Sequence, residues 1–384
     1  MKAAAAPADQ RFFAVAAPGL EAITAAELDK LGIPHEAPEP GGVGFGGGFD
    51  AMARANLWLR TSSRVLLRIG EFHARALGEL ERRAAGIEWD RYLSATQPVQ
   101  LRVTSRKSRL YHQKAIAERI SKAIARVTGA PVSAASGAED EAHDTGQLVI
   151  VRMLRDECLI SLDTSGELLH RRGYRQAVAK APLRETLAAA LLVASGWDPS
   201  FPLLDPFSGS GTIPIEAALL ARRIAPGLAR PFGFERWPGH DTAALERHRE
   251  AARASILPAT SAVISGSDRD TGAVEAARGN AGRAGVLADV SFEQAAVSAV
   301  AAPPGKGWVV SNPPYGVRVG EQRKLRDLYA RLGQVLRREF PGWTVALLLS
   351  RGYACAELGL ELDPVASTRN GGIEVEILVG LVPG

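Results

Sequence analysis

An eight-residue polar stretch with two closely spaced glycines follows a pair of leucines that read as the end of a buried strand. It consists of Asp205, Pro206, Phe207, Ser208, Gly209, Ser210, Gly211 and Thr212. The glycines allow a tight turn and let the backbone approach a ligand closely. An apolar helix is expected to begin at Thr212, with Pro214 tolerated in its first turn. Doubly wound folds hold nucleotides with this succession of strand, glycine turn and helix.

The glycine turn alone is a weak signal. The third glycine of the dinucleotide motif is missing here, and so is the Gly-Lys-Ser/Thr of a phosphate-binding loop. An ordinary loop is therefore an open alternative. A second apolar stretch, residues 262–268, ends at Asp268, where a carboxylate can accept hydrogen bonds from both hydroxyls of a ribose. Asp270 is the expected N-cap of the helix that follows.

A second polar loop follows the apolar strand at residues 308–311 and begins with Asn312, Pro313, Pro314 and Tyr315. The prolines fix the backbone and remove two amide donors. The side-chain carbonyl of Asn312 and the carbonyl of Pro313 are left as acceptors for the two N–H groups of an exocyclic amine. They would orient its nitrogen toward an incoming methyl group, while Tyr315 can stack on the base. The structural alternative is a rigid turn that ends a strand.

Length and composition predict two or three domains with ample apolar cores, since 46% of the 384 residues are hydrophobic. No apolar run reaches the roughly 18 residues of a membrane-spanning helix, and the N-terminal stretch is too short and weakly apolar for a secretory signal. Cys158 and Cys355 lie far apart, which gives neither a disulfide framework nor a metal spacing. A cytoplasmic protein without membrane or metal is expected.

Positive charge is concentrated in one part of the chain, although the net charge is only +4. Between Arg60 and Arg126 there are fifteen Lys and Arg against six Asp and Glu. This excess indicates a phosphate-binding surface, and the alternative is a solvated face in a protein that favours arginine.

The order of elements predicts an α/β protein with three parts. In residues 1–58, a strand at 12–15, a helix at 19–31 that ends at Gly32, and a glycine-dense hairpin at 41–48 are expected. In residues 59–165, strands are expected at 65–69, 99–103, 148–154 and 158–162, with a polar loop at 131–146. A helix within 106–127 has Ile116, Ile120 and Ile124 on one face, opposite basic positions.

From Gly166 onward, after a basic connector at 169–175, strands and helices alternate, which predicts a parallel sheet with helices on both faces. Helices are expected from 182 to about 195, after Thr212, through Asn280 and at 325–340. Strands are expected at 203–205, 262–268, 290–293, 308–311, 344–349 and 374–379.

The glycine turn together with Asn312-Pro313-Pro314-Tyr315 resembles the class I S-adenosylmethionine-dependent amino-methyltransferases. The segments 54–60, 63–67, 169–175 and 181–185 are similar to the THUMP-containing RNA guanine-N2 methyltransferases, most closely those acting on 23S ribosomal RNA. That resemblance implies a ferredoxin-like unit at 1–58, a THUMP RNA-binding domain at 59–165 and a Rossmann-like methyltransferase domain, a mostly parallel seven-stranded sheet, at 166–384.

The resemblance also implies roles for individual residues. It matches Asp205, Gly209 and Gly211 to the loop on the methionine side of S-adenosylmethionine, Asp268 to its ribose, and Asn312 to Tyr315 to the target base. Further cofactor-binding residues are expected at Pro206, Phe207, Ser208, Thr212 and Asn312. One departure is Ala296, where the family commonly has an Asp that contacts the adenine; Glu293 or Gln294 would have to replace it.

Four other functions compete with this interpretation. Carbon methylation of pyrimidines needs a cysteine nucleophile, and neither cysteine lies in the two loops. A tRNA guanine-N2 methyltransferase would use the same loops and domains and is the closest alternative. A DNA adenine-N6 methyltransferase would use the same Asn-Pro-Pro-Tyr loop, but the THUMP-like segment favours RNA as the substrate. A catalytically inactive RNA-binding factor for ribosome assembly is favoured only by Ala296.

Overall fold

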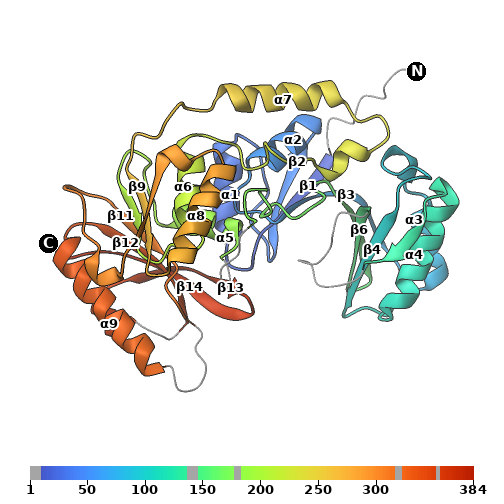
Figure 1. Cartoon of the computed structure of the whole chain (residues 1–384). Coiled ribbons are helices and arrows are strands. Elements are labelled where there is room, and N and C mark those ends of the chain that lie inside the picture. The colour runs from blue at the N-terminus through green and yellow to red at the C-terminus, as the bar shows by residue number, and fades with distance from the viewer. Residues whose placement is uncertain (1–9, 136–145, 177–182, 316–321, 352–354) are drawn as a thin grey trace.

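The computed structural model describes residues 10–135, 146–176, 183–315, 322–351 and 355–384. They form two lobes, each built on a seven-stranded sheet (Figure 1). The first lobe contains the strands of residues 10–163, and the second contains those of residues 203–381.

The sheet of the second lobe has the order β10-β9-β8-β11-β12-β14-β13. Neighbouring strands from β10 to β12 run parallel, and β14 is antiparallel to both β12 and β13. The predicted mostly parallel seven-stranded sheet is therefore confirmed. Its strands are β8 (Leu203–Asp205), β9 (Ile264–Asp268), β10 (Val290–Gln294), β11 (Trp308–Ser311), β12 (Thr344–Ser350), β13 (Asp363–Asn370) and β14 (Ile373–Leu381).

Helices cover both faces of this sheet. Each strand contributes side chains to both layers, because successive strand residues point to opposite sides. Val310 and Leu348 pack into one core, whereas Val309 and Leu347 pack into the other. The first core is completed by α5 (Glu185–Ala194), α6 (Thr212–Ala221) and α8 (Thr271–Arg283), and the second by α9 (Gln322–Glu339) and α10 (Cys355–Leu358).

The sheet of the first lobe has the order β2-β1-β3-β7-β6-β4-β5. Its strands are β1 (Gln10–Val15), β2 (Gly42–Gly47), β3 (Arg64–His73), β4 (Val99–Arg106), β5 (Val132–Ala134), β6 (Gln147–Leu154) and β7 (Glu157–Asp163), with helices α1 (Glu21–Lys30), α2 (Phe49–Trp58), α3 (Leu77–Ala85) and α4 (Gln113–Thr128). The long strand β3 pairs with β1 on one side and β7 on the other. The units expected at 1–58 and 59–165 therefore share one sheet, and the boundary between them stays a prediction, as does the name THUMP.

Two local predictions in the first lobe are wrong. The glycine-dense segment is not a hairpin but the single strand β2, antiparallel to β1. A Cβ at Gly42 would meet the Ala14 carbonyl oxygen at 2.1 Å, so this glycine serves close strand approach rather than a turn. The loop expected at 131–146 includes the short strand β5 at Val132–Ala134, and residues 136–145 lie outside the described residues.

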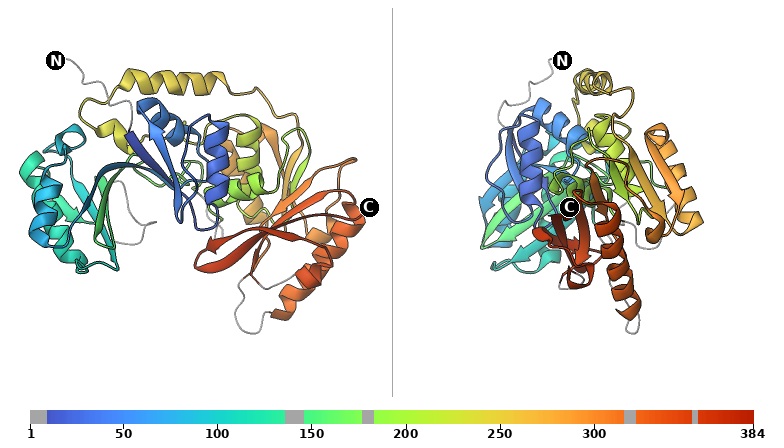
Figure 2. Two further views of the ribbon diagram at one scale, coloured as in Figure 1. Left: turned by 180° about the vertical axis from the view of Figure 1, so that it is seen from behind. Right: turned by 90° about the vertical axis from the view of Figure 1, so that its left-hand side faces the viewer.

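A segment from the second half of the chain, residues 230–254, packs against the first lobe and completes its core. Residues 230–254 contain a short 3₁₀ helix at Gly233–Arg236 and α7 (Thr242–Ala254), neither of which the sequence predicts. Phe232, Phe234 and Leu245 are buried in the core of the first lobe. Figure 2 shows α7 running along the upper side of the molecule, over the junction of the lobes. The chain therefore crosses back to the first lobe after the boundary expected at residue 166.

The basic connector, residues 169–175, takes part in a buried network that joins the lobes. The guanidinium of Arg60 donates to the Ile224 carbonyl just after α6, at 2.7 Å. Arg172 donates to the Arg60 carbonyl at 2.6 Å, and the Tyr174 hydroxyl donates to Glu216 of α6 at 3.0 Å. Since Arg60, Arg172 and Glu216 are all buried, these groups hold the lobes together instead of facing solvent.

Candidate active site

The residues expected to carry chemistry meet at one edge of the second sheet. The strands β9, β8 and β11 are adjacent and parallel, so their carboxyl ends point the same way. Asp268 ends β9, Asp205 ends β8, and Asn312 directly follows β11. The sequence predicted these three strand ends, and the topology brings them together.

The glycine turn has the backbone conformation that its sequence indicates. Gly209 and Gly211 have φ values of 51° and 83°, in the left-handed region that side chains rarely adopt. A Cβ at Gly211 would meet Ala277 and Phe292 at 2.9 Å, whereas a Cβ at Gly209 would meet nothing within 4 Å. Gly211 therefore lets the start of α6 pack closely against α8 and β10, and Gly209 leaves open space at the edge of the sheet.

Asp268 is part of the glycine turn as well as a candidate ligand group. One carboxylate oxygen accepts the N–H of Gly209 and the other accepts the N–H of Asp270, each at 3.0 Å. Ser208 adds a second tie, because its N–H donates to the Ser267 carbonyl at 2.9 Å. The predicted capping role of Asp270 is confirmed, since its side chain accepts the Ala273 N–H at the start of α8.

Asp205 links the glycine turn to the Asn312 loop. It is buried, and its Oδ1 accepts the Ser311 hydroxyl at 2.5 Å and the Phe207 N–H at 3.1 Å. Burial raises the pKa of this carboxyl from 3.8 to about 7, and the nearby Asp268 adds to the rise. Among the described residues none forms an ion pair with Asp205. The site thus contains a buried carboxyl that a cationic group would complement.

We expect the stability of the protein to depend on the ionisation of Asp205. Because its pKa is higher in the folded chain, folding favours the protonated form, and this stabilisation is lost as pH rises from 3.8 to about 7. Asp205→Asn keeps an acceptor but carries no charge. The melting temperature of the variant relative to wild type should therefore increase over this pH range, measured without ligand by calorimetry. A difference that is independent of pH would contradict the assignment.

The Asn312 loop holds a buried acceptor ready for a ligand. The Oδ1 atom of Asn312 is buried and has no hydrogen-bond partner within the described part of the chain. Pro313 is buried, and the Pro314 carbonyl accepts the Tyr329 hydroxyl of α9 at 2.7 Å. Asn370 of β13 donates to the Tyr315 hydroxyl at 2.6 Å. Together with the Ser311–Asp205 hydrogen bond, these contacts fix the loop on both sides of its prolines.

The remaining predicted residues support the turn. Pro206 is buried, and Phe207 is half-buried against the core under α9. Thr212 begins α6, and its hydroxyl accepts a hydrogen bond from Arg175 at 2.9 Å.

The position of the missing acidic residue lies beside this edge. Ala296 is exposed just after β10, and Glu293 and Gln294 are exposed at the end of that strand. The Gln294 amide donates to the Arg269 carbonyl at 3.2 Å, which ties the ends of β9 and β10 together. Gln294, two positions before Ala296, is thus a polar group that a contact already orients at this edge.

Sequence reasoning missed Ser311, Tyr329 and Asn370. Ser311 had a signal, since a hydroxyl at the buried end of an apolar strand needs a partner. Tyr329 and Asn370 had none, because their contacts depend on how α9 and β13 fold back onto the loop.

Other chemistries find little support in the described residues. Burial raises the pKa of the Cys158 thiol to about 12, and Cys158 lies in β7 of the first lobe. Within the described ranges, no three His, Cys, Asp or Glu side chains are grouped so that they could hold a metal ion. None of the helices searched there is both long and apolar enough to span a bilayer.

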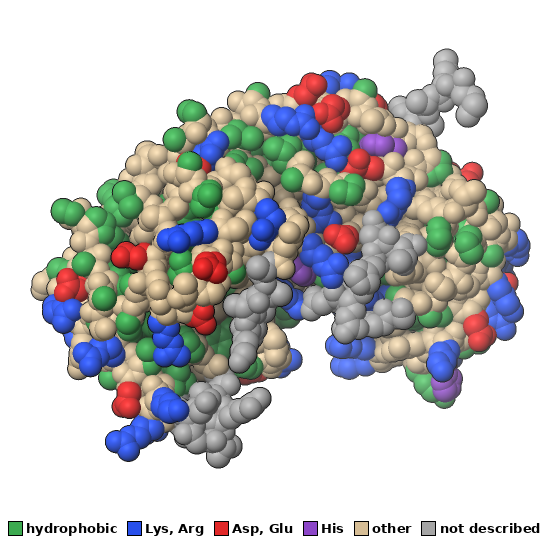
Figure 3. Space-filling model, in the orientation of Figure 1, with side chains coloured by type: hydrophobic (Ala, Val, Ile, Leu, Met, Phe, Trp, Pro, Cys, Tyr) green, Lys and Arg blue, Asp and Glu red, His purple; other side chains and the backbone are tan. Residues whose placement is uncertain are grey.

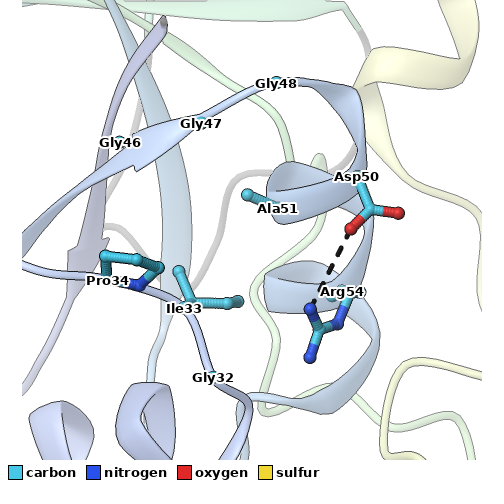
Figure 4. A pocket seen from close by; sticks show the side chains of 9 residues that line it. All are labelled: Gly32, Ile33, Pro34, Gly46, Gly47, Gly48, Asp50, Ala51 and Arg54. Atoms are coloured by element: carbon cyan, nitrogen blue, oxygen red, sulfur yellow. Dashed lines mark ion pairs between the residues drawn. The ribbon is translucent and has the colours of Figure 1, made fainter. Parts of the chain in front are cut away.

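A separate hollow lies in the first lobe, between the end of β2 and α2. Figure 4 shows it lined by Gly46 to Gly48, Ile33, Pro34 and the Asp50–Arg54 ion pair. It shares no residue with the edge that carries Asn312, so it is not part of the candidate site.

The sheet order, the glycine turn after β8, the acid after β9 and the Asn-Pro-Pro-Tyr loop after β11 define a class I methyltransferase domain. The RMKL-like methyltransferase domain family matches residues 172–358, and the RlmL ferredoxin-like domain matches residues 11–66. A Synechocystis protein, slr0064, whose name proposes an RNA methyltransferase, is 35% identical over 96% of this chain and 95% of its own. The chain belongs to the RMKL-like methyltransferases with an RlmL-type ferredoxin-like domain.

Two further relatives agree with this membership. The ribosomal RNA large subunit methyltransferase K/L of Syntrophotalea carbinolica is 36% identical over 96% of this chain, which spans about half (53%) of that relative. The crystal structure of SMU.472, described as a proposed methyltransferase in complex with SAH, is 31% identical with a TM-score of 0.87, covering 99% of this chain and 98% of that one. The predicted cofactor, S-adenosylmethionine, is confirmed at the level of the family.

Proposed function

We propose that this protein transfers a methyl group from S-adenosylmethionine to the exocyclic N2 of a guanine in RNA, with 23S ribosomal RNA as the substrate. The observation that carries the proposal is the buried Asn312 Oδ1, an acceptor without a partner among the described residues, at the end of β11. Such an acceptor is costly to bury unless a ligand donor satisfies it. An exocyclic amine supplies that donor.

The cofactor fits the residues at the sheet edge. Bound S-adenosylmethionine supplies an electrophilic methyl group. The open side of Gly209 accommodates close approach, the lone pairs of Asp268 that its backbone contacts leave free can accept ribose hydroxyls, and the buried Asp205 complements a cationic ammonium group. Gln294 is the substitute for the absent adenine-side acid.

The protein's own contribution to the chemistry is positioning and electrostatics. The Asn312 and Pro313 carbonyls hold both N–H groups of the amine, so its lone pair faces the methyl group. Tyr315, fixed through its hydroxyl by Asn370, presents its ring to the base. No base has to act first, because the nitrogen becomes strongly acidic only as it gains the methyl group.

The charge distribution of the first lobe supports RNA as the substrate. Arg60 and Arg64 are buried, and Arg68, Arg75, Arg83, Arg91 and Arg119 form ion pairs with acidic residues. Exposed cations concentrate on the end of β4, the loop after it and α4: Arg106, Lys107, Arg109, Lys114, Lys122 and Arg126. In Figure 3, basic side chains also flank the notch between the two lobes. A polyanion suits these surfaces.

The test is to identify the methylated nucleoside. Purified protein is incubated with S-adenosylmethionine and 23S RNA, and in a parallel reaction with total tRNA. Both RNAs come from a deletion strain, so that the target nucleotide is unmodified at the start. The methylated nucleosides are then identified by mass spectrometry. We expect N2-methylguanosine in 23S RNA. Methylation of tRNA alone would assign the tRNA enzyme, and N6-methyladenosine would overturn the base assignment. Cofactor binding without turnover on any RNA would favour the assembly factor.

A further inference from the structure

We propose that the loop between β4 and α4, residues 107–112, is a stacking site for an unpaired nucleotide of the RNA, remote from the reacting guanine. This inference rests on RNA being the substrate. It is built on Tyr111, whose exposed fraction of 66% is the largest among the exposed large apolar side chains of the described chain. A single exposed apolar residue is common on protein surfaces, so the proposal depends on the residues that surround Tyr111.

The aromatic surface is preformed. The Tyr111 ring lies against the exposed imidazole of His112, with ring centroids 4.0 Å apart and planes inclined by 39°. One face of the tyrosine is thus supported by a second ring. An unpaired base can extend this stack, because every base offers a flat aromatic face whatever its identity.

The loop that carries the pair is held in place by hydrogen bonds. Ser105 donates to the Leu110 carbonyl at 2.6 Å, and Ser108 donates to the Arg106 carbonyl at 3.1 Å. The Arg109 N–H donates to Asp156 at 2.7 Å, at the turn between β6 and β7. A loop fixed in this way loses little conformational freedom when it binds.

The charges around Tyr111 indicate which kind of partner this loop binds. Arg106, Lys107, Arg109 and Lys114 are all exposed and surround the tyrosine in sequence. Asp156, the acid that contacts this loop through the Arg109 N–H, is also engaged by the Arg75 guanidinium. Exposed aromatic and cationic groups together match single-stranded nucleic acid, in which bases are free to stack and phosphates are close by. A base within a duplex has no free face for Tyr111.

The site lies far from the methyltransferase sheet. Strand β3 begins at Arg64, which is paired with Asp163 and donates to the Gly166 carbonyl beside the connector. It ends at His73, next to Ala74, whose N–H donates to the Asp156 carbonyl. Ten strand residues span roughly 30 Å, so the loop lies about that far from the connector. The RNA must therefore extend well beyond the methylated guanine to reach it.

The test measures RNA binding by full-length protein, without cofactor. The probes are a fluorescent RNA hairpin with an unpaired tail and the same hairpin without it. Tyr111→Ala should bind the tailed hairpin about tenfold more weakly, a loss of about 1.4 kcal/mol, and the blunt hairpin as wild type does. Tyr111→Phe should bind both as wild type does. Val127→Ala, an exposed apolar position at the other end of α4, is the control and should change neither.

A fluorescent purine analogue in the tail gives a second readout, since its emission is quenched by stacking. Wild type should quench it and Tyr111→Ala should not. The double variant Arg109→Gln, Lys114→Gln should lower the slope of log affinity against log salt by about one for each phosphate left without a cationic partner. Unchanged tail affinity and quenching in folded Tyr111→Ala, or an equal loss on both hairpins, would overturn the stacking site. If wild type still methylates RNA in that case, the proposed function stands and only this site fails.

Discussion

Asn312→Ala should lose about 10²–10³ in kcat while affinity for S-adenosylmethionine and for RNA stays nearly unchanged. The guanine N2 lone pair is delocalised into the ring, so the amine is a weak nucleophile in the ground state. In the proposed mechanism, Asn312 holds that nitrogen pyramidal and aligned with the methyl group. The effect is therefore confined to the transition state, and it should appear in kcat rather than in binding.

The structure supplies matched controls for this experiment. Asn312→Asp keeps an acceptor at the same place and should retain more activity than alanine. Ser311 anchors the loop to Asp205 and is unchanged in both variants, so the loop itself should stay in place. Cofactor affinity by calorimetry and the melting temperature report on the fold. Wild-type turnover by Asn312→Ala would overturn the catalytic assignment.

Asp268→Ala should weaken S-adenosylmethionine binding about tenfold or more, because a hydrogen bond to a charged group contributes roughly 1.5–3 kcal/mol. The structure adds a second cause. Asp268 also accepts the Gly209 N–H, so its removal frees the glycine turn. A loss of affinity alone would not tell these two roles apart.

A cofactor analogue that lacks one ribose hydroxyl separates the roles. If Asp268 accepts that hydroxyl, wild type should bind the analogue more weakly than the natural cofactor, whereas Asp268→Ala should bind both alike. If both proteins discriminate equally, Asp268 supports only the turn. Unchanged affinity in a folded variant would remove Asp268 from the cofactor site altogether.

The sequence was sufficient for the sheet edge because the signals there are local. A strand ending in Asp205, one ending in Asp268 and one followed by Asn312 can each be recognised alone. A parallel sheet then collects their carboxyl ends without further information. The helix beginning at Thr212 and the buried face of α4 with Ile116, Ile120 and Ile124 were predictable for the same reason.

What could not be predicted depends on contacts between distant segments. The hydrogen bond from Ser311 to Asp205 spans 106 positions, and that from Asn370 to Tyr315 spans 55. Charge was the most misleading signal. Arg60 and Arg172 count as surface cations in the sequence, yet both are buried in the junction of the lobes. Nothing in residues 230–254 indicates that Phe232 and Phe234 belong to a core formed largely by residues before 170.

That segment determines the order in which the molecule can mature during synthesis. A chain is made from its N-terminus, and domains generally fold as they emerge. Here the core of the first lobe lacks Phe232, Phe234 and Leu245 until translation has passed β8 and α6. The first lobe can therefore complete its core only after the glycine turn at residues 205–212 has been synthesised, and before Asp268 and the Asn312 loop are made.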